Sequence, residues 1–144
     1  MPGVTRDEIH ALLARGIAAW RARDAATLTA MHAHNGVVAS PTGGVLEGRE
    51  EIQRIYRVFL AAFPDLTTQE DAELIDGDRA VMIQRFSGTH AGEFFGLPAT
   101  GRHVELTLAF VLTFRDGLIA EERRIYDFTG LLVQVGVLKA KPYV

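Results

Sequence analysis

The chain has 144 residues, 48% hydrophobic side chains and a net charge of −3, which fits one globular domain spanning residues 1–144. The absence of cysteine excludes disulfides, thiolate metal sites and cysteine nucleophiles. Basic residues are spread along the chain without forming a cluster, so we expect no nucleic-acid partner.

The N-terminal residues include acidic side chains and lack the continuous apolar core of a secretory signal. No run of about 18 apolar residues is present that would cross a membrane. We therefore expect a soluble, cytoplasmic protein that has no membrane partner.

The N-terminal third predicts two helices. Thr5 and Glu8 have the spacing of a capping box, and apolar residues then recur at helical spacing, which predicts an amphipathic helix over residues 6–22. Asp24 can cap a second, shorter helix, which ends at His32 and His34. Since two helical residues two positions apart lie on different faces, we expect no metal shared by these histidines.

A short strand over residues 36–40 precedes a third helix that opens at residues 48–51 and ends before Pro64. Its apolar stripe contains several aromatic side chains, which are usually core residues. Tyr56 is the member of this stripe whose hydroxyl can reach a ligand, and we consider it both as a core residue and as a ligand-binding residue.

Residues 66–75 and 79–88 read as antiparallel strands around the turn at residues 76–78. In the second strand Gln84 shares a face with Ala80, Met82 and Phe86. Both faces are half apolar, so we expect helices to cover one face of the sheet and a partner subunit to cover the other. The chain is thus expected to form a homodimer through its sheet.

Residues 88–101 contain four glycines and one proline, which predicts a mobile loop or a bulged edge. Its aromatic pair, Phe94 and Phe95, suits either a lid over a ligand or two anchors in the core. His90 begins the loop and either contacts a ligand oxygen or bonds to the loop backbone.

Residues 102–134 predict a long β-hairpin, because Asp116-Gly117 is a strong signal for a type I′ turn. A two-residue turn pairs Arg115 with Leu118, and regular pairing from there places Asp127 on one face with side chains that include Leu106, Leu108, Phe110, Arg123 and Ile125. Glu122 and Arg124 would then face the dimer surface. A single bulge would exchange the two faces.

An aspartate among leucine and isoleucine side chains is poorly solvated, which disfavours its charged form and suits a catalytic acid or base. Asp127 is therefore a candidate catalytic residue. The other interpretation is that Asp127 caps a short helical turn that begins at Phe128.

Two helices, a strand, a third helix and four further strands indicate an α+β fold. We expect a curved antiparallel sheet wrapped around the N-terminal helices, forming a cone-shaped barrel with a central apolar pocket.

Several motifs together resemble the SnoaL-like polyketide cyclases of the nuclear transport factor 2-like superfamily. They are Phe63-Pro64-Asp65-Leu66, the glycine-rich stretch from Gly88 to Arg102, Asp116-Gly117-Leu118-Ile119, and Asp127 followed by Gly130-Leu131-Leu132 and Gln134-Val135-Gly136. The resemblance covers nearly the whole chain. It implies an α+β cone with a deep apolar pocket, a homodimer formed through the sheet, and no cofactor.

In these cyclases an aspartate at the position of Asp127 is the general acid/base of an intramolecular aldol closure. A histidine and a glutamine on the preceding strand usually assist it. The corresponding positions here fall near Thr113 and Val111, so this chain departs from the family pattern.

The sequence therefore predicts a cofactor-independent acid/base enzyme, cyclase- or isomerase-like, for a hydrophobic oxygenated small molecule, with Asp127 and His90 as catalytic residues. The predicted ligand-binding residues are Tyr56, Gln84, Phe94, Phe95, Leu106, Leu108, Phe110, Arg123 and Ile125. The alternative is a protein that binds such a ligand without converting it. Epoxide hydrolysis is less favoured, because Asn35 is the only asparagine available to position a water.

Overall fold

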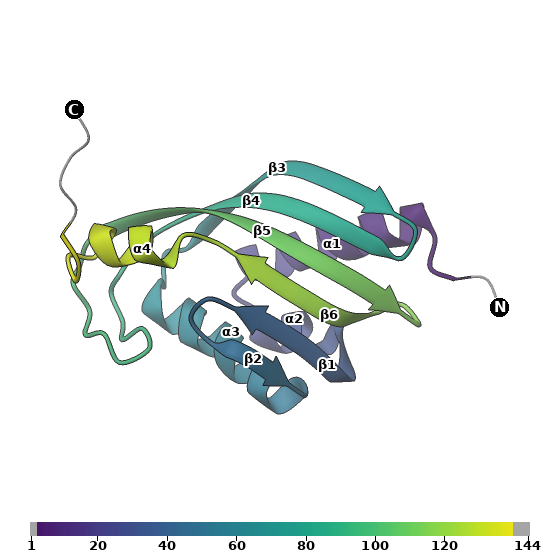
Figure 1. The fold of residues 1–144 in the computed structure, drawn as a ribbon, viewed down its shortest axis with the longest axis horizontal. Helices are drawn as coiled ribbons and strands as arrows, with labels where there is room; N and C mark the ends of the chain where they lie inside the picture. Colours follow the sequence, from purple (N-terminus) through teal and green to yellow (C-terminus); the bar gives the residue numbers. More distant parts are fainter. Residues whose placement is uncertain (1–2, 140–144) are drawn as a thin grey trace.

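The computed structural model describes residues 3–139 and shows an α+β fold (Figure 1). Helices α1 (Arg6–Arg21), α2 (Ala25–Ala30) and α3 (Arg49–Ala62) lie against one face of a curved, open sheet, and the short helix α4 (Phe128–Gln134) follows the last strand. The strands are β1 (His32–Ser40), β2 (Gly44–Glu47), β3 (Thr67–Asp76), β4 (Arg79–Thr89), β5 (His103–Arg115) and β6 (Leu118–Ile125).

The six strands form one sheet in the order β2-β1-β6-β5-β4-β3. All neighbours pair antiparallel except β1 and β6, which run parallel, so the sheet is mixed and not purely antiparallel as expected. The parallel pairing brings a strand from the N-terminal third beside the last strand of the chain.

Among residues 3–139, no helix combines the length and the apolar character that a membrane span needs.

The capping residues at the N-terminus act as predicted. Thr5 accepts a hydrogen bond from the Glu8 amide and Glu8 accepts one from the Thr5 amide, both at 3.2 Å. Asp24 accepts from the Thr27 amide at 3.0 Å and starts α2. These short local contacts set where both helices begin.

The placement of His32 and His34 at the end of the second helix was wrong, because both lie on β1. The Ile119 amide donates to the Met31 carbonyl at 2.8 Å, and His32 pairs with Ile119 of β6. This tertiary pairing ends α2 at Ala30 and starts β1 four residues earlier than the predicted strand. The side chain of His32 is fully buried, whereas that of His34 is exposed.

The β5–β6 turn confirms the predicted type I′ geometry, since φ is positive at both Asp116 and Gly117. The pairs Arg115–Leu118 and Phe114–Ile119 also form as predicted. A bulge then follows, so Thr113 pairs with Glu121 and Leu112 with Glu122. The predicted register is therefore wrong beyond Ile119.

The bulge has a visible cause in the burial of two successive side chains. Ile119 and Ala120 are both buried, although successive residues of a regular strand point to opposite faces. Beyond the bulge, Glu122, Arg124 and Tyr126 are buried, whereas Glu121 and Arg123 are exposed. The two sets of side chains on β6 have thus exchanged faces relative to the prediction.

The core lies between the helices and the inner face of the sheet and is rich in aromatic rings. Trp20 packs edge-on against Tyr56 and Phe86, with ring centroids 5.3 and 5.1 Å apart. Within residues 3–139, this packing contains two small cavities of about 10 and 30 Å³. The central apolar space of the fold is therefore nearly filled by side chains.

Candidate active site

Four polar side chains gather inside the core, where apolar packing is the norm. They are His32 from β1, Tyr56 from α3, and Glu122 and Arg124 from β6, and none is more than 5% exposed. Buried charges in proteins are normally paired, and clusters of this kind concentrate at functional sites. We therefore take these four residues, called the core polar cluster below, as the candidate active site.

The members of the core polar cluster form one connected set of contacts. His32 Nε2 and the Tyr56 hydroxyl share a hydrogen bond of 2.7 Å. Arg124 Nε donates to Glu122 Oε2 at 2.6 Å, and the other carboxylate oxygen, Oε1, lies 4.0 Å from His32 Nε2. The Arg124 guanidinium lies over the Tyr56 ring, 4.7 Å from its centroid.

Burial decides the protonation states in the cluster. It lowers the pKa of His32, against the opposing influence of Glu122, so the imidazole is neutral at neutral pH. Burial also raises the pKa of the Tyr56 phenol, which keeps its proton. For Arg124, burial disfavours the charge, but Glu122 and Tyr56 outweigh it and the pKa is raised. The cluster thus holds a neutral imidazole, a phenol and an ion pair.

Two nitrogen atoms of the cluster have unused hydrogen-bonding capacity. Within residues 3–139, neither His32 Nδ1 nor Arg124 Nη2 has a hydrogen-bond partner, although both atoms are buried. Buried polar atoms without a partner are rare in proteins, because each costs free energy. The cluster is therefore not fully satisfied by its own contacts.

The larger of the two cavities, about 30 Å³, lies beside the cluster between α1, α2 and the sheet. Among residues 3–139, Tyr56 and Glu122 are the only lining residues with a side-chain oxygen atom. The rest of its wall is apolar and consists of Leu12, Leu13, Gly16, Trp20, Leu28, Met31, Met82, Phe110, Leu112, Phe114 and Ile119. One carboxylate and one phenol therefore meet an apolar cavity.

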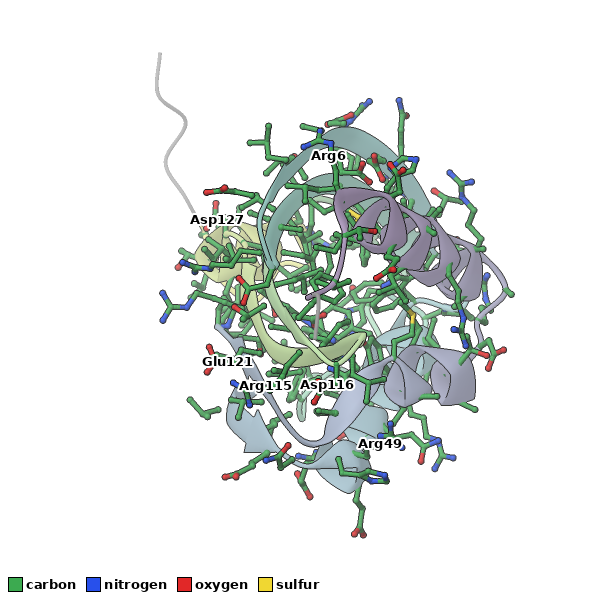
Figure 2. The ribbon with its side chains drawn as sticks, turned by 90° about the vertical axis from the view of Figure 1, so that its right-hand side faces the viewer. Arg6, Arg49, Arg115, Asp116, Glu121 and Asp127 are labelled. Carbon is green, nitrogen blue, oxygen red and sulfur yellow. The ribbon has the colours of Figure 1, made fainter. Side chains whose placement is uncertain are left out.

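Asp127, the predicted catalytic aspartate, lies outside the core. Its Oδ1 accepts a hydrogen bond from the Gly130 amide at 2.8 Å and caps α4, and its side chain is exposed. Figure 2 shows Asp127 and Glu121 at the margin of the molecule, on the side of the sheet away from α1 and α2. The placement of Asp127 among Leu106 and Leu108 was wrong, and the cap interpretation is confirmed.

Because the two faces of β6 are exchanged relative to the prediction, two predicted ligand-binding residues lie on the outer face of the sheet and not in the core. Arg123 is exposed, and Ile125 keeps 50% of its surface exposed. Both side chains belong to the outer face of the sheet. Glu122 and Arg124, which were expected on that outer face, take their place inside.

The remaining predicted ligand-binding residues of the sheet lie on its inner face. Leu106, Leu108 and Phe110 are all buried, and Phe110 lines the cavity beside the cluster. Gln84 is fully buried, but both ends of its amide are occupied: Oε1 accepts from Thr68 at 2.5 Å and Nε2 donates to the Met82 sulfur at 3.0 Å.

The side chains of the loop between β4 and β5 differ in how deeply they are buried. Phe94 is buried against Phe59 and Phe63, so it is a core anchor, whereas Phe95 is 36% exposed. His90 is fully buried and shares a 3.0 Å hydrogen bond with the Thr100 hydroxyl.

His90 lies apart from the core polar cluster. Its ring packs on Phe63, which directly follows the end of α3, whereas Tyr56 lies six residues before that end, or about 9 Å along the helix at 1.5 Å per residue. The structure therefore brings Tyr56 together with the cluster, but not His90.

Sequence reasoning missed His32, Glu122 and Arg124. The stretch Glu121-Glu122-Arg123-Arg124 presents a glutamate and an arginine on either face of a strand, so alternation alone does not distinguish the two registers. The two successive apolar residues Ile119 and Ala120 are the one local signal of the bulge. His32 was missed because the sequence analysis placed it at the end of the second helix and not on a strand.

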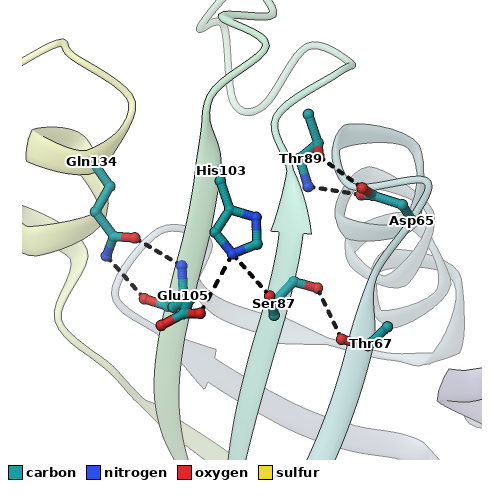
Figure 3. A network of polar contacts seen from close by, with 7 residues as sticks. All are labelled: Asp65, Thr67, Ser87, Thr89, His103, Glu105 and Gln134. Carbon is teal, nitrogen blue, oxygen red and sulfur yellow. Dashed lines mark hydrogen bonds and ion pairs between the residues drawn. The ribbon is translucent and has the colours of Figure 1, made fainter.

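A second group of polar side chains lies on the outer face of the sheet, near the C-terminal end of β4 (Figure 3). Ser87 Oγ lies 3.1 Å from His103 Nε2, and Glu105 Oε1 lies 3.4 Å from the same nitrogen. In a catalytic triad the acid contacts the other ring nitrogen, which fixes the imidazole for proton transfer. This exposed trio therefore lacks the geometry of a serine hydrolase.

The same region fastens helix α4 and the loop between α3 and β3 to the sheet. Gln134 of α4 accepts from the Glu105 amide at 2.7 Å and donates to its carbonyl at 2.9 Å, and Asp65 accepts from the Thr89 amide and hydroxyl, both at 2.7 Å (Figure 3). Within residues 3–139, no group of three or more histidine, aspartate or glutamate side chains converges as a metal site would require. The outer face near α4 is thus explained by structural contacts.

The sequence profile of the SnoaL-like polyketide cyclases matches residues 10–135. The chain belongs to the SnoaL-like polyketide cyclase family. In this chain Asp127 is exposed, whereas the core polar cluster is buried. No curated protein sequence matches the chain.

Solved structures support the family assignment. AclR from Streptomyces galilaeus, described as a candidate hydroxylase, is 28% identical, with a TM-score of 0.83 over 96% of this chain and 87% of its own. TsrD from Streptomyces laurentii is also 28% identical, with a TM-score of 0.82 over 94% and 99% of the two chains. IdmH from Streptomyces antibioticus, described as a candidate polyketide cyclase, is 30% identical, with a TM-score of 0.73 over 88% and 97%.

Proposed function

We propose that the protein is a cofactor-independent acid/base enzyme, cyclase- or isomerase-like, that acts on a hydrophobic oxygenated small molecule through the core polar cluster. The observation that carries this proposal is that Glu122 and Tyr56, alone among residues 3–139, bring side-chain oxygen atoms to an otherwise largely apolar cavity inside the fold. Family membership and the likeness to IdmH and AclR support the reaction class.

In the proposed reaction, two members of the cluster act directly on the substrate. Glu122 is the acid/base: its Oε1 takes a proton from the carbon beside a substrate carbonyl. The Tyr56 hydroxyl donates a hydrogen bond to the carbonyl oxygen as negative charge develops there. The proton then returns from Glu122 to another carbon of the enolate, which isomerises the substrate, or to the oxygen formed when the enolate attacks a second carbonyl, which closes a ring.

The other two members position these groups. Arg124 holds Glu122 Oε2 at 2.6 Å, so Oε1 is the oxygen that remains to meet a substrate, and His32 holds the Tyr56 hydroxyl at 2.7 Å. Placing an ion pair in a core costs several kcal/mol of desolvation per ion, so such a pair is weak evidence for stability. Its presence beside a cavity is better explained by function.

The test is exchange of carbon-bound protons, which does not require the natural substrate. A cyclic ketone such as 2-decalone is incubated with the protein in D₂O, and the loss of proton signals beside the carbonyl is followed by NMR. We expect the protein to accelerate exchange over buffer and Glu122→Gln to lower the rate by about 100-fold or more. Glu121→Gln, a neighbouring carboxylate on the outer face, is the matched control and should retain the rate.

The alternative is a protein that binds a hydrophobic ligand without converting it. The apolar wall of the cavity favours this alternative, because few polar groups converge there. Binding of the ketone with an exchange rate equal to that of buffer would establish the alternative and reject the enzyme.

We also propose that the chain forms a homodimer through the outer face of its sheet. Val81, Ile83 and Val111 are only half-buried on this face, and Ile125 is half exposed, with charged side chains such as Arg85 around them. Sedimentation equilibrium should give twice the chain mass of 15.8 kDa, and Ile125→Glu should reduce it to the monomer. A monomeric parent protein would contradict the proposal.

A further inference from the structure

We infer that Gly16 of α1 is a specificity-determining residue: beside the flexible Met31, its missing side chain leaves the place where the cavity wall yields to the body of the substrate. This inference rests on the proposed function, because it takes Glu122 and Tyr56 as the reacting groups. It adds the side of the cavity on which the rest of the substrate lies.

The cavity beside the core polar cluster has to enlarge before it can hold a substrate. Its volume of about 30 Å³ gives room for about two or three water molecules, since one water needs about 10–15 Å³. A molecule that contains a ring must therefore displace part of the wall. The part of the wall that yields most easily decides where the body of the substrate lies.

One turn of α1 is the part of the wall closest to solvent. Within residues 3–139, Leu12 and Gly16 are partly exposed, whereas every other residue that lines the cavity is buried. Leu12 and Gly16 are four residues apart in the helix, so they lie one above the other on the same face. The route from solvent to the cavity therefore passes this turn of α1.

Neither the backbone nor the packing requires a glycine at position 16. Gly16 lies inside α1 and is not among the glycines with positive φ. A Cβ atom built there would meet Met31 Cε at 3.6 Å and Met31 Sδ at 3.8 Å, which are ordinary contact distances. Glycine inside a helix is destabilising relative to alanine. A destabilising residue where alanine would fit is typical of a functional position.

Met31 faces Gly16 from the C-terminal end of α2 and is suited to move. It lines the cavity together with Met82. Methionine is unbranched and adapts its rotamer to irregular spaces. When the Met31 side chain changes rotamer, the space over Gly16 becomes part of the cavity, whereas a methyl group at position 16 would occupy that space.

The reacting groups come from other walls of the cavity, Tyr56 from α3 and Glu122 from β6. A substrate whose carbonyl meets these two side chains extends toward α1, and its far end reaches the surface at Gly16. Oxygen atoms at that end keep contact with water and are not buried without a partner. The arrangement therefore suits a substrate with more than one carbonyl, as ring closure requires.

The test compares Gly16→Ala with the parent protein on two ketones of different size, cyclohexanone and 2-decalone, by proton exchange in D₂O. We expect Gly16→Ala to lower kcat/KM at least about tenfold for 2-decalone and less than about twofold for cyclohexanone, because the added methyl group occupies space that the larger body needs. The same variant should raise the melting temperature by about 2–4 °C, because alanine favours the helix.

Ala18→Gly is the matched control, because Ala18 is exposed on the same helix and does not line the cavity. It should lower the melting temperature and keep the parent preference between the two ketones. A glycine with a purely structural role would give a lower melting temperature in Gly16→Ala and equal losses on both ketones. That result would overturn the inference.

Binding separates this inference from the proposed function. Trp20 is the only tryptophan in the sequence and lines the cavity, so its fluorescence reports binding of either ketone. If the parent protein binds 2-decalone without proton exchange, the enzyme is rejected, and weaker binding of 2-decalone alone by Gly16→Ala still supports the role of Gly16. Exchange by the parent protein with an unchanged size preference in Gly16→Ala would overturn the inference and leave the enzyme standing. A parent protein whose fluorescence responds to neither ketone would overturn both.

Discussion

Leu112 of β5 lies opposite Glu122 of β6, one residue later than a regular hairpin would place it. This one-residue offset turns Glu122 and Arg124 into the core and leaves Glu121 and Arg123 outside. The composition of the interior, and with it the candidate site, depends on that offset.

Replacing Glu122 by glutamine should destabilise the fold by about 3–5 kcal/mol, because it leaves the buried charge of Arg124 without its partner. Glu121→Gln should change the stability by no more than about 0.5 kcal/mol, since Glu121 is exposed. Urea unfolding of the two variants measures the difference. Equal losses would mean that the register of β6 is not the one described.

The stability of the protein should fall as the pH drops from 7 to 5, in part because of His32. Burial lowers the pKa of His32 in the folded state, so this group contributes stability that is fully present above the unfolded-state pKa of about 6.5. That contribution is lost as the pH falls toward the lowered folded pKa, by at most about 1.4 kcal/mol per pH unit for one proton.

Urea unfolding at several pH values of His32→Gln and of His34→Gln tests this assignment. The first variant should show a shallower loss between pH 7 and 5, whereas His34→Gln should keep the parent profile, because His34 is exposed on the same strand. A parent-like profile for His32→Gln would refute the assignment.

Tyr56→Phe should lower the rate of carbon-bound proton exchange by about 100-fold, because it removes the hydrogen-bond donor to the developing oxyanion. It should also cost about 1–3 kcal/mol of stability, since His32 Nε2 loses its 2.7 Å partner. Tyr126→Phe is the matched control, because the Tyr126 hydroxyl bonds Thr42 and not the cluster. Equal effects of the two variants on exchange would argue against a role for Tyr56.

Asp127→Ala should cost about 1 kcal/mol of stability, because Asp127 caps α4 through the Gly130 amide. Asp127→Asn should stay within a few tenths of a kcal/mol of the parent protein, since asparagine is an equally good cap. Urea midpoints of the two variants distinguish a capping role, which asparagine keeps, from one that requires the carboxylate charge.

Phe94→Ala should cost about 3–5 kcal/mol, because its ring fills the core between Phe59 and Phe63. Phe95→Ala, at the exposed neighbouring position, should cost less than about 1 kcal/mol. Thermal unfolding of both variants tests whether the loop is anchored by one phenylalanine. Similar losses would mean that both rings are anchors.

Much of the fold follows from local signals in the sequence. The capping box at Thr5 and Glu8, the stripe of α3 and the Asp116-Gly117 turn each set an element through contacts within a few residues, and the structure contains all of them. Such signals are read reliably because the interacting residues are close in the sequence.

The features that the sequence did not reveal depend on contacts between distant segments. The strand that contains His32 forms because β1 pairs with β6, nearly ninety residues later, and this pairing overrides the apparent continuation of α2. The bulge at Ala120 reverses every later side chain of β6, and the repeated acidic and basic residues there fit either register.

The candidate site shows the consequence of both effects. Tyr56 was identified because α3 has a clear helical period, whereas Glu122 and Arg124 were assigned to the wrong face. The family pattern drew attention to Asp127, whose side chain caps a helix on the outer side. The one-residue shift of β6 against β5 therefore left the predicted fold nearly correct but placed the predicted site residues on the wrong face.

The central claim is that Glu122, and not Asp127, is the carboxylate that exchanges protons with the substrate. The most direct test measures proton exchange beside the carbonyl of 2-decalone in D₂O for Glu122→Gln and Asp127→Asn, each shown to be folded. We predict that Glu122→Gln loses at least about 100-fold in rate and that Asp127→Asn retains the parent rate. Loss of exchange in Asp127→Asn together with full activity in Glu122→Gln would contradict the claim.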